Sequence, residues 1–189
     1  MQPEPASASS SAPESPADGV RRLVVEAVSH SMRSVQGTEH GELHLYLSLL
    51  QDRLPVYVGT VADLLAHAGG AGVRKNLVMV AEATINFYSE VLAAKVAVLA
   101  NPAQLVRLRQ VMRPRRLGPH QAEHAVAVYL RQEQEIGRVA ADADPVGAAR
   151  LLIGACLNYA FTLLLLGDDA LPPRHEYAAV LVQGMRVTP

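Results

Sequence analysis

The stretch Leu151–Leu166, with the sequence LLIGACLNYAFTLLLL, decides the fold. Its 16 residues contain no charged side chain. A transmembrane helix needs about 20 predominantly apolar residues, so this run favours a helix buried in protein. A helix that is apolar nearly all round must be covered on every side, and a second copy of the chain is a natural cover. The alternatives are that the helix is the core of the monomer or that it spans a membrane.

Helix start and stop signals extend outward from this stretch. Asp144-Pro145 precedes it as a helix start, with a capping residue before a proline, and Gly167 follows it as a helix stop. Asn101-Pro102 and Gly118-Pro119 are helix starts of the same kind. No long stretch alternates polar and apolar residues at period two. The sequence therefore predicts an all-α fold, with helices near 20–36, 42–67 (with a break or kink near Pro55), 73–100, 102–113, 119–136, 145–166 and 173–186.

The composition predicts one folded domain. Half of the 189 residues are hydrophobic and 19% are charged, which excludes global disorder. The net charge of −1 does not suggest a wholesale nucleic-acid binder, and the single cysteine, Cys156, excludes an intramolecular disulfide framework. Residues 1–18 are Pro, Ser, Ala and acidic residues, which predicts a disordered tail and not a secretory signal. These features are compatible with a cytoplasmic protein.

The search for catalytic and metal-binding patterns gives no positive sign. His120 and His124 are four residues apart, as are His40 and His44, but neither pair has an evident third ligand. No GxSxG, P-loop or GxGxxG spacing occurs. Cys156 lies inside the apolar run, where a thiol is usually inert. We expect no enzyme activity, no cofactor and no metal site.

The C-terminal two-thirds, about residues 60–187, resembles the regulatory domain of the TetR family of bacterial transcriptional regulators. The resemblance rests on a helix ending YLRQEQEIGRV (129–139), a DADP helix start (142–145), the small-residue segment ARLLIGA (149–155) and the link LGDD-x-LPP (166–173). ADLLAHAGGAGVRKNLVMVAEATINFYSEV (62–91) also resembles the first long helices of that domain. The resemblance implies a ligand-binding and dimerisation domain over residues 60–189.

In the TetR family the last two helices pair with their copies to form a four-helix bundle. The resemblance places residues 145–166 and 173–186 in that role, where Gly154, Ala155 and Ala160 would permit close helix approach. The predicted dimer-interface residues are Leu151, Tyr159, Leu163, Tyr177, Val180 and Leu181.

The family also binds a small molecule among the long helices, in a pocket expected to be mostly apolar with a few polar groups. The candidate ligand-binding residues, for a small apolar ligand, are Met79, Thr84, Tyr88, Met112, Tyr129, Asn158, Phe161 and Thr162. Asn158 is the sharpest case because an amide among leucines must find a partner. Its alternative role is a structural hydrogen bond to a neighbouring helix or to its dimer copy.

Residues 19–59 depart from the family's DNA-binding headpiece. Arg21–Met32 resembles its first helix and Leu45-Tyr46 the end of its recognition helix. Only seven residues, TEHGELH, separate Gly37 from Leu45, which is too few for a helix, a turn and a second helix. Asp52 falls about where the family has a phosphate-contacting lysine. The headpiece is therefore degenerate, truncated or of a variant form, and no DNA-binding residue can be assigned.

The charges of the chain bear on DNA binding. Residues 1–60 hold four arginines and seven acidic residues, a net charge of −3. Val91–Ala122 holds six basic residues and no acid, which suggests either a solvated face or an anion-binding surface. We expect a ligand-responsive homodimeric TetR-like regulator, with a small apolar ligand as partner and operator DNA as a candidate partner. The alternative is a ligand-binding or protein-interaction dimer without DNA binding.

Overall fold

The computed structural model describes residues 41–70, 72–114 and 117–187. It consists of helices α2 (Glu42–Ala66), α3 (Val73–Ala100), α4 (Pro102–Met112), α5 (Pro119–Glu135), α6 (Pro145–Leu166) and α7 (Arg174–Gly184), with a 3₁₀ turn, η1 (Asp168–Ala170), before α7. The described residues form no strand, so the predicted all-α class is confirmed. The tail at 1–18, the helix at 20–36 and most of the headpiece region lie outside the described residues.

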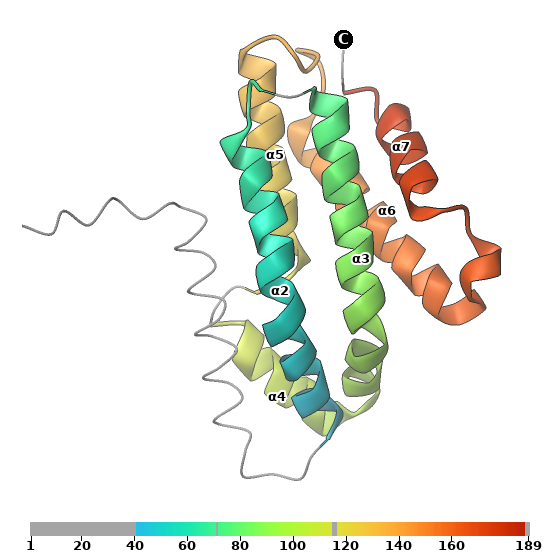
Figure 1. Cartoon of the computed structure of the whole chain (residues 1–189). Coiled ribbons are helices and arrows are strands. Elements are labelled where there is room, and N and C mark those ends of the chain that lie inside the picture. Colours follow the sequence, from blue (N-terminus) through green and yellow to red (C-terminus); the bar gives the residue numbers. More distant parts are fainter. Residues whose placement is uncertain (1–40, 71, 115–116, 188–189) are drawn as a thin grey trace, which may run out of the picture.

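The long helices form a bundle in which α3 is central (Figure 1). α3 packs against α2 on one side and against α6 and α7 on the other, and α5 packs against both α2 and α6. The short helix α4 lies at the end of the bundle where α2 begins and α3 ends. Thirteen of the 28 residues of α3 are buried, because neighbours cover it on several sides.

The starts of α4 and α6 have the local chemistry that the sequence predicts. The Asn101 carboxamide accepts hydrogen bonds from the Ala103 and Gln104 amides at 3.1 and 3.3 Å, and the Asp144 carboxylate accepts one from the Val146 amide at 3.0 Å. Each cap satisfies amides that have no partner within the first turn of a helix. Gly167 ends α6 with φ of 84°, a left-handed conformation that favours glycine.

Helix α2 continues through Pro55. The sequence predicts a break or kink there, and the structure contains no break, because one helix runs from Glu42 to Ala66. Proline removes one backbone donor and costs about 3 kcal/mol in a helix interior. Packing offsets this cost, because Leu50 and Tyr57, on either side of Pro55, are buried in the core.

Candidate functional site

The interior between α2 and α3 contains a group of aromatic side chains around Thr84. The rings of Tyr57 and Phe87 are stacked with centroids 4.7 Å apart, and Tyr88 lies next to Phe87 at 5.3 Å. The Thr84 hydroxyl donates to the Val80 carbonyl at 2.7 Å, so the Tyr57 hydroxyl, at 3.1 Å, donates to Thr84. Burial raises the pKa of Tyr57 to about 12 and also raises the pKa of Tyr88. These phenols are therefore neutral at physiological pH.

A second buried polar group lies between α3 and the end of α5. The Asn76 amide donates to the Tyr129 hydroxyl at 2.9 Å. The fully buried Glu133 accepts from the Gly69 amide at 3.0 Å and pairs with Arg138, whose Nε lies 3.1 Å from Oε2. Burial, with a smaller contribution from the bond to Glu133, raises the pKa of Tyr129 to about 12, and the bond to Asn76 lowers it in part. This network ties the α2–α3 turn to α5.

The structure separates the candidate ligand residues into an inner and an outer group. Thr84, Tyr88 and Tyr129 are buried in the two groups just described, and Met112 and Thr162 are half-buried. The other three candidates are exposed: Met79, Asn158 and Phe161. Asn158 and Phe161 point outward because α6 packs against α3 and α5 with its opposite face, which contains Leu152 and Cys156.

The outward side of α6 carries a row of exposed residues. We call this row the α6 stripe; it consists of Leu151, Gly154, Asn158, Phe161 and Leu165. Leu151 is 66% exposed and Leu165 is 64% exposed, so the stripe presents large apolar side chains at both ends. The spacings of three and four residues in alternation place the stripe on one side of the helix. The same spacing is present in the sequence, but the stripe cannot be recognised there, because most residues between its members are also apolar.

The candidate dimer residues divide between this surface and the monomer's own α6–α7 contact. Leu151 and Val180 are exposed, whereas Leu163, Tyr177 and Leu181 are half-buried and Tyr159 is buried. The Tyr159 hydroxyl donates to the Pro172 carbonyl at 2.8 Å and the Tyr177 hydroxyl to the Ala155 carbonyl at 3.2 Å. The two rings lie 4.7 Å apart. Both tyrosines therefore hold α7 against α6 within one chain.

The start of α7 is fixed to α3 by two polar contacts. The Arg174 guanidinium donates to the Asn86 side chain at 2.8 Å, and His175 Nδ1 lies 2.6 Å from a carboxylate oxygen of Glu82. These contacts and the tyrosine pair set the position of α7 beside α6. Val180 of α7 is exposed as well, at 64%.

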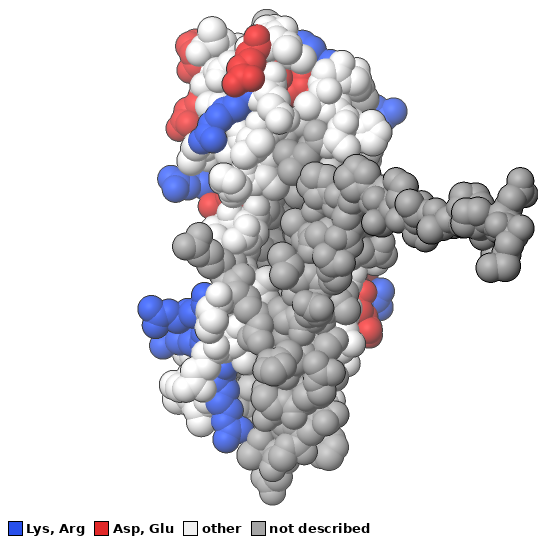
Figure 2. Space-filling view, turned by 90° about the vertical axis from the view of Figure 1, so that its left-hand side faces the viewer, with Lys and Arg blue, Asp and Glu red and all other residues white. Residues whose placement is uncertain are grey.

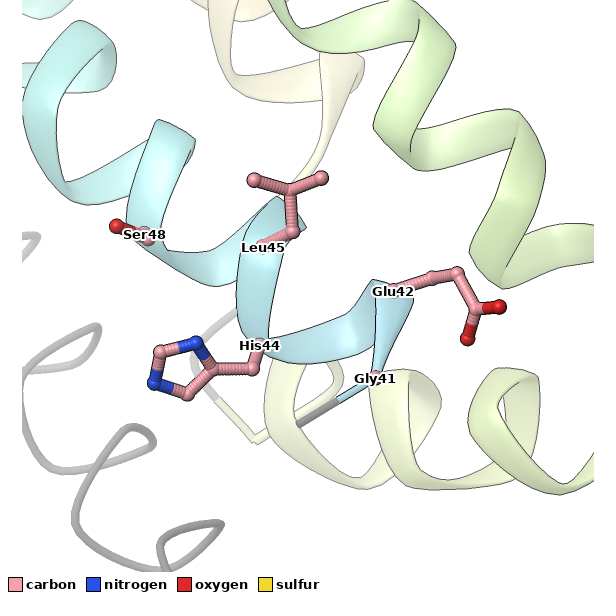
Figure 3. Close-up of a pocket in the computed structure, with 5 residues that line it drawn as sticks. All are labelled: Gly41, Glu42, His44, Leu45 and Ser48. Carbon is pink, nitrogen blue, oxygen red and sulfur yellow. The ribbon is translucent and has the colours of Figure 1, made fainter. Parts of the chain in front are cut away.

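A shallow hollow lies at the start of α2 (Figure 3) and is lined by Gly41, Glu42, His44, Leu45 and Ser48. Glu42 contacts Gln104 of α4. Hydrogen bonds from its own backbone amide and from Gln104 lower the pKa of Glu42. None of the candidate ligand residues lines this hollow, which lies where the described part of the chain begins.

The described histidines of the two pairs and the cysteine lie in different environments. His120 and His124 are both exposed on α5, and His40 lies outside the described residues. No group of three or more metal-binding side chains occurs among residues 41–70, 72–114 and 117–187. Cys156 is fully buried, and burial raises the pKa of its thiol to about 12.

Two described helices, α3 and α6, are long and apolar enough to cross a membrane by length and composition alone. In the most apolar window, 56% of the α3 residues and 33% of the α6 residues are buried inside the molecule. The low burial of α6 again reflects its exposed outer side, while α3 is a core helix.

Comparison with protein families supports the resemblance. A family model described as the C-terminal domain of AefR-like transcriptional repressors matches residues 76–187, from the first turn of α3 to beyond the end of α7. The chain belongs to the TetR family. Neither the curated proteins nor the solved structures include a significant match.

The family match shows which helices belong to the regulatory domain. α3 to α7 form the regulatory domain of a TetR-like regulator, and α2 precedes the matched segment. The family recognised from the sequence and its all-α architecture are both confirmed. TetR regulatory domains belong to regulators of transcription rather than to a class of enzymes.

Proposed function

We propose that this TetR-family protein is a cytoplasmic, small-molecule-responsive homodimer that regulates transcription. The observation that carries the proposal is the exposed α6 stripe together with Val180 of α7. Monomeric soluble proteins rarely expose large contiguous apolar patches, and such patches commonly mark interfaces. A two-fold dimer would bring α6 and α7 against their copies as a four-helix bundle.

The details of the surface fit close helix packing. A Cβ added at Gly154 or Gly184 would meet no atom within 4 Å, so the space beside both glycines is open to a second helix. Spacings of three and four residues in alternation are those of a helix–helix seam. Asn158 lies within that seam, where its amide would bond to its copy, and this is the structural role that the sequence left open for it.

Sedimentation velocity tests the dimer with charge substitutions on and off this surface. Leu151→Glu and Val180→Glu should each make the protein monomeric, because a carboxylate would be buried without a partner. Val56→Glu is the matched control, since Val56 is an equally exposed apolar residue, 70% exposed, but lies on α2. A wild-type protein that sediments as a monomer at high concentration, or a dimer unaffected by both substitutions, would overturn the dimer.

The ligand site is proposed among α2, α3, α5 and α6, around the inner candidates Thr84, Tyr88 and Tyr129. Their hydroxyls and aromatic rings supply the few polar groups and large apolar area typical of small-molecule sites. The ligand would act by favouring one conformation of the dimer over another.

Thermal-shift screening with apolar small molecules tests the site. A compound that raises the melting temperature of the wild type should lose most of this effect with Tyr88→Ala and keep it with Met79→Ala on the exposed side of α3. Equal effects on both variants would contradict the inner site.

Recovery of the protein in the membrane fraction of cells would contradict the cytoplasmic location.

A second candidate is a ligand-binding or protein-interaction dimer that does not bind DNA. The net charge of −3 over residues 1–60 favours it, because affinity for DNA comes largely from neutralising phosphates. A mobility-shift assay on the DNA upstream of the protein's own gene separates the two. Tight binding that weakens steeply with salt supports a DNA-binding regulator, and no binding at low salt supports the second candidate.

A further inference from the structure

Helix α4 carries only positive charge. Leu108 is its one buried residue, whereas Arg107, Arg109 and the capping residue Arg113 are all exposed. We call these three residues the α4 arginine surface. The sequence from Val91 to Ala122 contains no Asp or Glu, so no carboxylate on neighbouring positions offsets this charge.

Unlike Arg53 and Arg138, the arginines of α4 have no partner among the described residues. Arg53 pairs with Glu90 at 3.0 Å, and Arg138 pairs with Glu133. Among the described residues, Arg107, Arg109 and Arg113 make no ion pair and no side-chain hydrogen bond. Glu42 contacts α4, but through Gln104. The charge of the α4 arginine surface therefore remains available to an external anion.

The three arginines lie along the two edges of the outward side of α4. At about 3.6 residues per turn, Arg109 and Arg113 lie one turn apart along one edge of that side, and Arg107 lies along the other edge. Between the edges are Ala103, Val106 and Gln110, which are neutral and exposed. This side is thus a basic strip whose larger exposed apolar residues are Pro102 and Val106.

The strip is held on a fixed platform. The Asn101 cap fixes the first turn of α4, and the Gln104 carboxamide oxygen accepts a hydrogen bond from the Leu43 amide of α2 at 2.8 Å. Leu108 anchors the opposite side in the core. The backbone that carries the arginines is therefore in place before any ligand binds.

The location of α4 is also informative. α4 adjoins the start of α2, which lies within residues 19–59, where the resemblance places the headpiece. On the face in Figure 2, the upper end shows acidic and basic side chains together, whereas the lower end, at the height of α4, shows basic ones. Residues 1–60 have a net charge of −3, so any contact of this end of the molecule with DNA phosphates depends on positive charge from elsewhere, and α4 carries such charge.

We propose that the α4 arginine surface binds the phosphate backbone of double-stranded DNA. Guanidinium groups form paired hydrogen bonds with phosphate oxygens, and such contacts position a protein on DNA without reading its sequence. An anionic membrane fits less well, because stable binding to a membrane usually combines basic charge with inserted apolar side chains, and the strip offers only Pro102 and Val106 for insertion. This inference goes beyond the proposed dimer and ligand site, and it assigns a DNA contact to the regulatory domain itself.

The test is fluorescence anisotropy of the full chain with a labelled 30-base-pair duplex of arbitrary sequence over a series of salt concentrations. The triple variant Arg107→Gln, Arg109→Gln, Arg113→Gln should bind about tenfold more weakly at low salt. Its slope of log affinity against log salt should fall by about one for each arginine that contacts a phosphate.

The matched control removes the same charge from the other end of the molecule. Arg74→Gln, Lys75→Gln, Arg131→Gln changes three exposed cations at the start of α3 and near the end of α5, far from α4 (Figure 1). This control should bind as the wild type does. Sedimentation velocity and circular dichroism on both variants separate loss of DNA binding from loss of the dimer or of the fold.

Three results would overturn the proposal. The first is a wild type that does not bind the duplex at low salt, and the second is equal weakening by the two triple variants. The third is binding that depends on the α4 arginines with phosphatidylserine vesicles but not with DNA, which would assign the surface to membranes. The dimer and ligand proposals are unaffected by each of these results, because their assays contain no DNA.

Discussion

Glu133 is the only fully buried charged residue in the part of the chain that the structure describes. Its carboxylate depends on the Gly69 amide and on Arg138, whose side chain is 29% exposed. The sequence places Glu133 on the inward side of its helix, but the partners come from a turn 64 residues away and from the residues after α5. Buried charges are tolerated only with such partners, so this network should be sensitive to the loss of one member.

Replacing Arg138 by Met should lower the free energy of unfolding by about 3 kcal/mol, because it leaves the Glu133 carboxylate buried without its cation. Urea denaturation followed by circular dichroism measures the change. The double variant Glu133→Gln, Arg138→Met should lose less, since a neutral carboxamide can still accept from Gly69. Arg131→Met, at an exposed position of the same helix, should change stability little, and an equal loss there would refute the explanation.

Cys156 should resist alkylation in the folded protein. Burial raises the pKa of its thiol to about 12, so at pH 8 the group is protonated, and only the thiolate is nucleophilic. Mass spectrometry after incubation with iodoacetamide should show the unmodified chain under native conditions and one adduct in 6 M guanidinium. Fast modification of the native protein would mean that the inner side of α6 is open to solvent.

At the scale of elements, helix boundaries are set locally and helix continuity is set by packing. The starts of α4 and α6 follow from Asn101-Pro102 and Asp144-Pro145, and the end of α6 follows from Gly167. Pro55 within α2 shows the other case. Its local preference disfavours a helix, but buried contacts on both sides of it maintain one.

The contribution of the α6 N-terminal cap to the free energy of unfolding should be measurable by itself. Asp144→Ala removes the acceptor of the Val146 amide and should lower the free energy of unfolding by about 1 kcal/mol. Asp144→Asn should retain most of the stability, because a carboxamide oxygen caps almost as well. Asp142→Ala, an exposed position two residues earlier, is the control in the same denaturation experiment. A loss as large for Asp142 would point to general charge effects instead of capping.

At the scale of the whole molecule, the exposed α6 stripe links stability to association. If the stripe and Val180 are covered only in the dimer, unfolding and dissociation are coupled. The apparent stability of one chain then includes the free energy of burying apolar surface between two copies.

The midpoint of urea denaturation should therefore rise with protein concentration over the range from 1 to 100 μM. The same series for Leu151→Glu should show a lower midpoint that does not depend on concentration. Fluorescence of the tyrosines or circular dichroism provides the signal. A wild-type midpoint independent of concentration would count against a dimer that is coupled to folding.

The sequence was sufficient for the family, the fold class and nearly all helix bounds within the described residues, because capping groups, prolines and glycines act over a few residues. It grouped Asn158 and Phe161 with Thr84 and Tyr88 as ligand residues, whereas the structure places the first two on the outside of α6 and the other two inside. It treated Tyr159 and Tyr177 as dimer contacts, and the structure gives both a role within one chain.

The division between local and tertiary information has a physical cause. Where a helix has one apolar side, as in α5, the pattern of side chains alone fixes which side faces the core, and Val126 and Leu130 are buried as their spacing indicates. α6 is apolar nearly all round, so its sequence contains no contrast that could orient it. Only packing against α3 and α5 turned Leu152 and Cys156 inward and left Leu151, Asn158 and Phe161 facing outward.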